Sequence, residues 1–241
     1  MSALINGKVI YSWARLLFPY NRSLTGSGNI KTLKFIKTKL KNLNILKFPT
    51  NKKVFDWKVP YVWNVKDAFV SDENNNRIID FKKNNLHLVG YSHPLNKKIS
   101  YNQLIKHMHY LKKQPNAIPY ITSYYKKYWG FCLSYNQFKK LDKNKNYHAC
   151  IRSSYKKGFM HLGEVLIKGK SKKEILLSTN ICHPSMGNNE LSGLVTTMAI
   201  AQYLQSKKKL HYSYRILFLP ETIGSISYIS KNIKKMKKNI I

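Results

Sequence analysis

Residues 174–183 read Glu-Ile-Leu-Leu-Ser-Thr-Asn-Ile-Cys-His, an apolar segment of strand length that ends in polar residues. The segment that follows, Pro-Ser-Met-Gly-Asn-Asn-Glu, has the composition of a turn. The next apolar residues have the spacing of one helix face, at Leu191, Leu194, Val195, Met198 and Ala199. This part of the chain therefore predicts a strand, a polar turn and a helix in succession.

The next part of the chain repeats the same order. Tyr-Ser-Tyr-Arg-Ile-Leu-Phe-Leu-Pro at 212–220 predicts a strand, Glu221 follows it directly, and a helical pattern covers 226–233. A right-handed crossover through a helix places two such strands in parallel, with both carboxyl ends at one edge. Ligands bind at this edge in open α/β sheets. Because His183, Glu190 and Glu221 all lie in turns that follow strands, we expect them to converge there.

The whole chain predicts an α/β fold with a mixed, largely parallel sheet flanked by helices and with a small β-rich inserted domain. Helical apolar spacing occurs near the N-terminus, whereas the chain beyond Lys52 alternates short apolar segments with polar turns. We therefore predict an N-terminal helical part of the core at 1–51, the inserted β-rich domain at 52–97, and the main part of the α/β core at 98–241.

Glycines mark two further turns. Gly-Lys-Ser-Lys at 169–172 predicts a tight turn between a strand at 163–168 and the strand that begins at Glu174. Asn-Arg-Ser-Leu-Thr-Gly-Ser-Gly at 21–28 lacks both the glycine spacing of a P-loop and its Lys-Ser/Thr ending. We interpret this loop as a turn that leads into a helix, and the alternative is that it positions Arg22 near a substrate.

The formal net charge of +33 raises the question of nucleic-acid binding, because clustered cations release counterions from phosphate. Of the 43 basic residues, the arginines are only Arg15, Arg22, Arg77, Arg152 and Arg215. Dedicated nucleic-acid sites favour arginine, whose planar group binds phosphate and guanine through two hydrogen bonds. The lysines are spread along the whole chain and fit an A/T-rich coding sequence. We therefore predict nonspecific binding of polyanions through charge and no specific nucleic-acid partner.

Cysteine usage and hydropathy indicate a cytoplasmic protein. The three cysteines, Cys132, Cys150 and Cys182, are an odd number without metal-type spacing, which fits a reducing compartment. No apolar segment approaches the roughly 18 residues of a membrane span, and the N-terminus lacks the layout of a signal peptide. Cys182 is interpreted as a small buried residue that closes a strand, with a soft metal ligand as the alternative.

A histidine and carboxylates at one sheet edge suit zinc, which binds such ligands at about 2.0–2.2 Å and keeps one position open for water. A second carboxylate nearby can accept the proton of that water. Simpler interpretations exist, since Glu190 also suits a helix N-terminus and His183-Pro184 also suits the end of a strand. With only ten acidic residues in the chain, the placement of Glu190 and Glu221 in two turns after strands favours a site.

Four motifs carry a resemblance to the bacterial aminopeptidase-like family of unknown function. They are Leu-Phe-Pro-Tyr-Asn-Arg-Ser-Leu-Thr-Gly at 17–26, Val-Phe-Asp-Trp-Lys-Val-Pro at 54–60, Ile-Cys-His-Pro-Ser-Met-Gly-Asn-Asn-Glu-Leu-Ser-Gly at 181–193, and Pro-Glu-Thr-Ile-Gly-Ser at 220–225. The resemblance covers nearly the whole chain. It implies the zinc aminopeptidase fold with a small inserted β domain, in which His183 matches the first metal ligand.

The chain departs from that family at two positions. Where the active enzymes have an aspartate that bridges two zinc ions, this chain has Asn189, with the carboxylate one residue later at Glu190. Where they have adjacent glutamates, a general base and a ligand, this chain has Pro220-Glu221. The resemblance also implies that further ligands follow Ile241, so that this chain is expected to be the N-terminal part of a longer protein and inactive alone.

Two functions from different classes follow. The first is a metal-dependent hydrolase of peptide or amide bonds, with one or two zinc ions held by His183, Glu190 and Glu221 and with Glu221 as ligand or catalytic base. The second is a binding protein on a degenerate aminopeptidase fold without hydrolysis, linked to cell-envelope polysaccharide metabolism, and it is motivated by Asn189 and Pro220.

Overall fold

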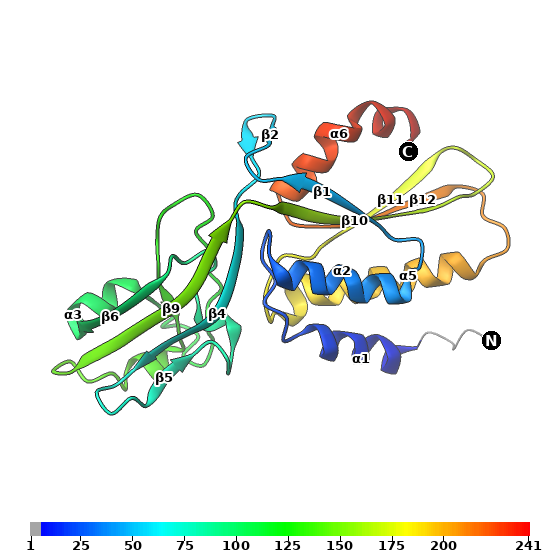
Figure 1. Ribbon diagram of the computed structural model, residues 1–241. Helices are drawn as coiled ribbons and strands as arrows, with labels where there is room; N and C mark the ends of the chain where they lie inside the picture. The colour runs from blue at the N-terminus through cyan, green and yellow to red at the C-terminus, as the bar shows by residue number, and fades with distance from the viewer. Residues whose placement is uncertain (1–5) are drawn as a thin grey trace. The chain divides into compact units, whose positions relative to one another are not determined.

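The computed structural model describes residues 6–241, which form two compact units (Figure 1). The first unit combines the chain up to residue 62 with residues 157–241, and the second comprises residues 63–156. Both halves of the first unit contribute strands to one sheet. The 63–156 segment is therefore inserted between two strands of that sheet, β1 and β10.

The sheet of the first unit has the strand order β1-β10-β12-β11. Its strands are β1 (Asn44–Pro49), β10 (Phe159–Ile167), β12 (Ser213–Leu219) and β11 (Glu174–Asn180). β11 and β12 pair in parallel from Glu174 opposite Ser213 to Asn180 opposite Leu219, as their spacing in the sequence predicts. The other two pairings, β1 with β10 and β10 with β12, are antiparallel, so the sheet is mixed.

The turn between β10 and β11 does not make the predicted hairpin, because β12 lies between these strands. The turn hydrogen-bonds instead to the segment that leads into β12. Lys170 N–H donates to Leu210 O and Ser171 N–H donates to His211 O, while Gly169 N–H donates to Ser213 Oγ. These bonds keep β10 and β11 separated by the width of one strand. The apolar strand β12 lies between them.

Helices cover both faces of this sheet (Figure 1). One face packs against α1 (Gly7–Leu17), α2 (Ser27–Lys39) and α5 (Ser192–Ser206), and α6 (Ile223–Asn239) lies on the other. Apolar side chains of the three helices and the central strands form the main core, among them Leu33, Ile36, Leu194, Met198 and Phe218. Because β12 is covered on both faces, five of its residues in succession from Arg215 to Leu219 are buried, and the last four of these are apolar.

The second unit is a β-rich body with the strand order β5-β4-β9-β6. Its elements are β4 (Val62–Ser71), β5 (Arg77–Asp80), η1 (Asn85–His87), β6 (Leu95–Ser100), α3 (Tyr101–Leu104), η2 (Ile105–His107), β7 (Met108–His109), β8 (Phe131–Cys132), α4 (Tyr135–Phe138) and β9 (Asn146–Lys156). β7 and β8 pair in parallel as a separate two-stranded sheet.

The boundaries of this unit differ from the predicted insertion at 52–97. The hairpin of β2 (Lys53–Val54) and β3 (Trp57–Lys58) belongs to the first unit. At the other end, β9 pairs along its length with β6, which brings residues up to 156 into the β-rich unit. The composition of the sequence shows where short strands begin, but the partner of β6 lies about 50 residues further along the chain.

Arg215 at the centre of the first unit is buried with two carboxylates. Its Nε donates to Glu174 Oε2 at 2.5 Å and its Nη2 to Glu174 Oε1 at 2.8 Å. Its Nη1 donates to Glu164, which also accepts from the Tyr228 hydroxyl at 2.5 Å. Asn239 Nδ2 donates to Glu174 Oε1 at 3.1 Å. This network joins β10, β11, β12 and α6, and the hydrogen bond with Arg215 lowers the pKa of Glu174.

We expect Glu174→Gln to lower the free energy of unfolding by about 3 kcal/mol at pH 7, because it breaks a buried ion pair from one side. A carboxyl with a lowered folded-state pKa adds stability that is complete above its unfolded pKa of about 4.3 and is lost as the pH falls through the folded value. The difference between wild type and variant therefore shrinks below about pH 4.3. Urea unfolding followed by circular dichroism at pH 7 and pH 3.5 measures it.

The exposed carboxylate of Asp56 gives the control, and Asp56→Asn is expected to change the unfolding free energy by less than about 0.5 kcal/mol at either pH. A loss on Glu174→Gln that is equally large at both pH values would contradict the role assigned to the ionised carboxylate.

Candidate metal centre

The candidate site begins where β11 ends. Ile181 N–H still donates to Leu219 O at 3.0 Å, so the pairing with β12 continues one residue beyond the strand. Cys182 and His183 follow at the carboxyl edge of the sheet, and both are buried. The backbone thus delivers the His183 ring to the edge where the sequence predicts a site.

Glu190 turns back toward this strand end from the π-helical turn η3 (Gly187–Leu191). Its Oε2 accepts from the backbone N–H of Cys182 at 2.5 Å and of His183 at 2.6 Å, and lies 2.8 Å from His183 Nδ1. The backbone of Glu190 has φ 86° and ψ −61°, in the left-handed region that non-glycine residues avoid. Such a conformation costs of order 1–3 kcal/mol and persists when the surroundings determine it. The hydrogen bonds that this carboxylate accepts hold the Glu190 backbone in that conformation.

Arg22 neutralises Glu190 from the other side. Its Nε donates to Glu190 Oε1 at 2.9 Å, and its Nη1 donates to Leu17 O at 2.6 Å. Both side chains are fully buried. Arg22 Nη2 is buried and has no hydrogen-bond partner within residues 6–241. A buried carboxylate requires a counter-charge and filled hydrogen bonds, and Glu190 obtains both from within the chain.

The loop at 21–28 is held in the position that brings Arg22 to Glu190. Asn29 Oδ1 accepts from Ser23 N–H at 3.0 Å, and Asn29 Nδ2 donates to Ile181 O at 3.0 Å, which fixes the loop against the end of β11. A Cβ added at Gly28 would lie 2.0 Å from Asn21 O, so glycine is required there. Of the two interpretations of the loop, the structure shows a turn into α2 that also buries Arg22 against Glu190.

These contacts fix the orientation of the His183 ring. In the tautomer in which Nδ1 donates to the Glu190 carboxylate, Nε2 carries the lone pair of the ring. Nε2 lies 3.2 Å from Glu221 Oε2. Histidines that bind metal through one ring nitrogen commonly donate through the other to a carboxylate, which sets the tautomer and raises the basicity of the ligand. His183 has this arrangement, with Nδ1 at Glu190 and Nε2 directed at Glu221.

Glu221 closes the site from the turn after β12. Its N–H donates to Cys182 Sγ at 3.1 Å, which joins this turn to the end of β11. Its side chain is 53% exposed, in contrast to the buried Glu190. Burial, and next the charge of Glu190, raise the pKa of the Cys182 thiol well above its usual value, so Cys182 is a neutral acceptor in this arrangement. This agrees with the interpretation of Cys182 as a buried residue at a strand end.

The structure therefore brings the three predicted site residues together. One ligand atom each from Cys182, His183 and Glu190 lies within 4.8 Å of the others, which is compatible with a metal ion. His183 Nε2 and the exposed Glu221 carboxylate face each other across 3.2 Å. The role of Glu190 as a ligand stays a prediction, and it would require exchange of the bonds to Arg22 and to the three N–H groups.

Sequence reasoning missed the role of Arg22. A signal was present, because five arginines in a chain with 43 basic residues invite the question of what each one does that lysine cannot. Arginine is the usual partner of a buried carboxylate because its charge is permanent and its donors are fixed in one plane. The identity of that carboxylate, 168 residues away, was not readable from the sequence.

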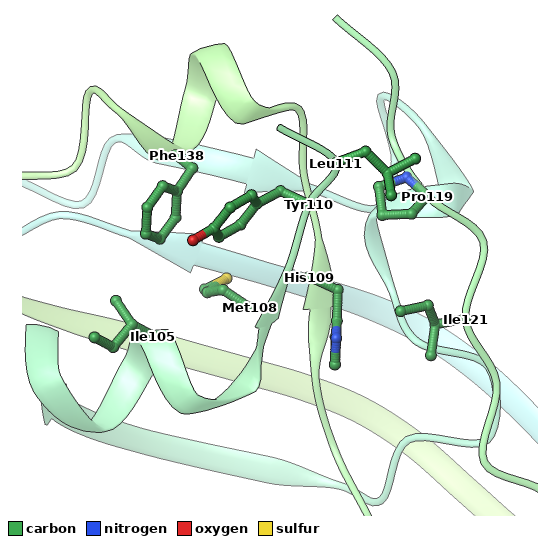
Figure 2. Close-up of a pocket in the computed structure, with 8 residues that line it drawn as sticks. All are labelled: Ile105, Met108, His109, Tyr110, Leu111, Pro119, Ile121 and Phe138. Atoms are coloured by element: carbon green, nitrogen blue, oxygen red, sulfur yellow. The ribbon is translucent and has the colours of Figure 1, made fainter. Parts of the chain in front are cut away.

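The second unit contains a cavity of about 310 Å³ with a different character (Figure 2). Its lining is mainly apolar and aromatic, with the rings of Tyr110 and Phe138 stacked 4.1 Å apart. The histidine in this lining, His109, lies 2.8 Å from the Tyr128 hydroxyl through Nε2. No carboxylate lines the cavity, so it offers no acid–base or metal chemistry comparable to the His183 site.

A family model described as a domain of unknown function, DUF4910, matches residues 11–241. A Clostridium acetobutylicum protein is 45% identical over 231 residues, which are 96% of this chain and 52% of the relative. It is named, provisionally, a polysaccharide biosynthesis protein with an aminopeptidase-like domain. The chain thus spans about half the length of this curated relative.

Solved structures show the same fold. A crystal structure from Clostridium acetobutylicum, described provisionally as a peptidase, matches with a TM-score of 0.93 and 44% identity over 97% of this chain and 55% of that one. A zinc aminopeptidase from Bacillus subtilis matches with a TM-score of 0.61 and 12% identity, over 97% and 65% of the two chains. A peptidase M28 precursor from Shewanella amazonensis gives 0.59 and 10%, over 97% and 69%. These likenesses confirm the predicted zinc aminopeptidase fold. No helix within residues 6–241 has the length and apolarity to span a membrane.

We expect Arg22→Met to lower the free energy of unfolding by about 3–5 kcal/mol, because it leaves Glu190 buried without its counter-charge. The double variant Arg22→Met with Glu190→Leu is expected to recover part of this loss, because it removes both charges. Urea unfolding of both variants and the wild type provides the comparison.

Arg15→Met is the matched control, since Arg15 is exposed in the last turn of α1, and it is expected to cost less than about 1 kcal/mol. If Arg22→Met were as mild as this control, the Arg22–Glu190 pair would not be the contact that holds the site together.

Proposed function

The chain belongs to the family described as a domain of unknown function, DUF4910, and from this premise we propose that it is the site-bearing part of an aminopeptidase-like, metal-dependent hydrolase. Its substrates would be peptides or small molecules with an amide bond. The named relative and the structural neighbours support the fold and the class of protein. The whole protein's activity is part of the proposal, because the relatives are longer than this chain.

One observation carries the proposal. His183 Nε2 and Glu221 Oε2 face each other across 3.2 Å at the carboxyl edge of two parallel strands, while Glu190 holds the opposite ring nitrogen. This donor set fits zinc, which accepts neutral imidazole and carboxylate ligands. His183 and Glu221 would hold the ion, and a bound zinc ion would polarise the carbonyl group of the scissile bond.

The residues of the chain have distinct tasks in this scheme. Glu190 accepts a hydrogen bond from His183 Nδ1, which leaves Nε2, directed at Glu221, as the candidate ligand atom. Arg22 pairs with Glu190 and holds its carboxylate in place. Glu221 is exposed and can turn, which suits either a ligand or a group that takes a proton during the reaction. Because Pro220 supplies no second carboxylate, we assign Glu221 to the metal first.

Catalytic zinc sites usually have three protein ligands, and this arrangement offers two candidates among the described residues, His183 and Glu221. Further ligands would come from Glu190 after rearrangement or from outside this chain.

The cysteines within residues 6–241 are all free thiols, which supports the proposal of a reducing, cytoplasmic location.

A second candidate function is a binding protein without hydrolysis. It is favoured by the engagement of both Glu190 oxygens with Arg22 and N–H groups, and by Pro220 at the position of a catalytic carboxylate. The name of the Clostridium relative makes polysaccharide biosynthesis the context to consider for this alternative.

Zinc binding by the chain tests the first proposal. We expect equilibrium dialysis followed by elemental analysis to give about one zinc ion per wild-type chain, and a loss of at least tenfold in affinity for His183→Ala and for Glu221→Ala. His211→Ala is the control, because His211 is exposed in a loop away from the site, and it is expected to match the wild type.

Equal zinc content in wild type and His183→Ala would remove the metal centre. Hydrolysis of an aminoacyl-amide panel by zinc-loaded protein separates the two candidates, because the binding-protein function predicts metal or ligand binding without turnover.

A further inference from the structure

A second concave site lies at the opposite edge of the same sheet. A cavity of about 680 Å³ opens where the turn between β10 and β11 meets the last turns of α6. Five lysines line it: Lys168, Lys172, Lys234, Lys235 and Lys238. Its volume is within the range of pockets that bind small molecules. The lining therefore combines a ligand-sized hollow with a high density of positive charge.

This cavity is separate from the His183 site. Glu174 and Ser213, which contribute to its lining, are the first residues of the parallel strands β11 and β12. His183 and Glu221 follow the last residues of the same strands. A strand of seven residues is about 20 Å long, so the two sites lie at opposite edges of the sheet.

None of the five lysines forms an ion pair within the described part of the chain. The carboxylate in the lining, Glu174, is buried and is already bound by two donors of Arg215 and by Asn239. The hydrogen bond of Arg215 is the main cause of the lowered pKa of Glu174, and the charge of Lys235 is a smaller one. Glu174 is therefore engaged mainly by Arg215.

The lysines come from two segments that the fold brings together. Lys234, Lys235 and Lys238 lie in the last turns of α6, where lysines also favour the helix dipole. That effect does not account for Lys168 and Lys172, which lie at the β10–β11 turn. A bridge between Glu174 and Ile240 and the hydrogen bond from Ile241 N–H to Glu174 O hold the end of α6 at this turn. The convergence of both segments on one hollow distinguishes these lysines from the many that are spread over the surface.

We propose that this cavity binds a small molecule that carries two or more phosphate groups. Lysine binds phosphate as a mobile point charge, and several lysines around one hollow suit several phosphate groups of one ligand. Binding relieves the repulsion among the five ammonium groups, so the affinity falls with rising salt. A phosphate from a lipid headgroup has the same chemistry and is distinguished by the test below.

Isothermal titration with inorganic tripolyphosphate at about 150 mM salt tests the proposal. The variant Lys172→Gln/Lys234→Gln/Lys238→Gln removes three charges from the cavity, and Lys31→Gln/Lys34→Gln/Lys37→Gln removes three exposed charges from α2. We expect the cavity variant to weaken binding at least tenfold and the α2 variant to weaken it less than about threefold, since the change in net charge is equal. Thermal unfolding of both variants checks that each is folded.

Parallel titrations with vesicles that contain phosphatidic acid and with an oligothymidine identify the source of the phosphate. Tripolyphosphate binding that the cavity variant loses supports the proposal. Absence of tripolyphosphate binding, equal weakening by both variants, or binding confined to vesicles or oligonucleotide would overturn it. The proposal does not depend on zinc at the other edge, and His183→Ala is expected to bind tripolyphosphate like the wild type.

Discussion

The Glu190 carboxylate is the contact on which the arrangement of the first unit's functional edge depends. One oxygen is held by Arg22 from the loop between α1 and α2, and the other by two backbone N–H groups and by the ring of His183 at the end of β11. The loop that carries Arg22, 168 residues away in the sequence, thus meets the turn of Glu190 and the end of β11 on one side chain. The cost of burying this charge is offset only when all its partners are present, so the turn, the loop and the strand end are ordered together. The positive φ of Glu190 costs conformational free energy, and the arrangement of its partners maintains it.

A second buried arginine, Arg215, neutralises buried carboxylates toward the opposite edge of the same sheet. Arg215 binds Glu174 and Glu164, so two of the five arginines of the chain neutralise three of its ten carboxylates within one unit. Lysine would be a poorer choice at either place, because its single ammonium group cannot fill the planar set of donors and loses its charge more readily on burial. The excess positive charge is therefore carried mainly by lysines at the surface, where water solvates it, while Arg22 and Arg215 serve the buried carboxylates. This division explains how a chain of net charge +33 still forms ionised contacts in its core.

Much of the site was predictable because its signals are local. Strands followed by polar turns and amphipathic helices define the β11 and β12 units, and the handedness of the crossover then brings His183, Glu190 and Glu221 to one edge. The failures all concern pairing across the sequence. The turn after β10 has the composition of a hairpin, but its neighbour in the sheet is β12 because that strand is apolar enough for the centre. The β-rich unit extends to residue 156 because β9 pairs with β6. Arg22 contacts Glu190 across 168 residues, and its own loop gives no sign of that partner.

The two residues that face each other in the candidate metal centre, His183 and Glu221, differ in how firmly they are held. His183 is buried, and its ring is fixed through Nδ1 by a carboxylate that is itself fixed. Glu221 is attached through its backbone N–H to Cys182 Sγ, while its carboxylate is about half exposed. The position of the turn is therefore set, but the side chain can rotate. A buried, positioned imidazole beside an exposed carboxylate would let a metal ion bind with adjustment of Glu221 alone. The buried Cys182 thiol accepts from the N–H of Glu221 and so joins the turn after β12 to the end of β11, and burial raises its pKa well above the usual value.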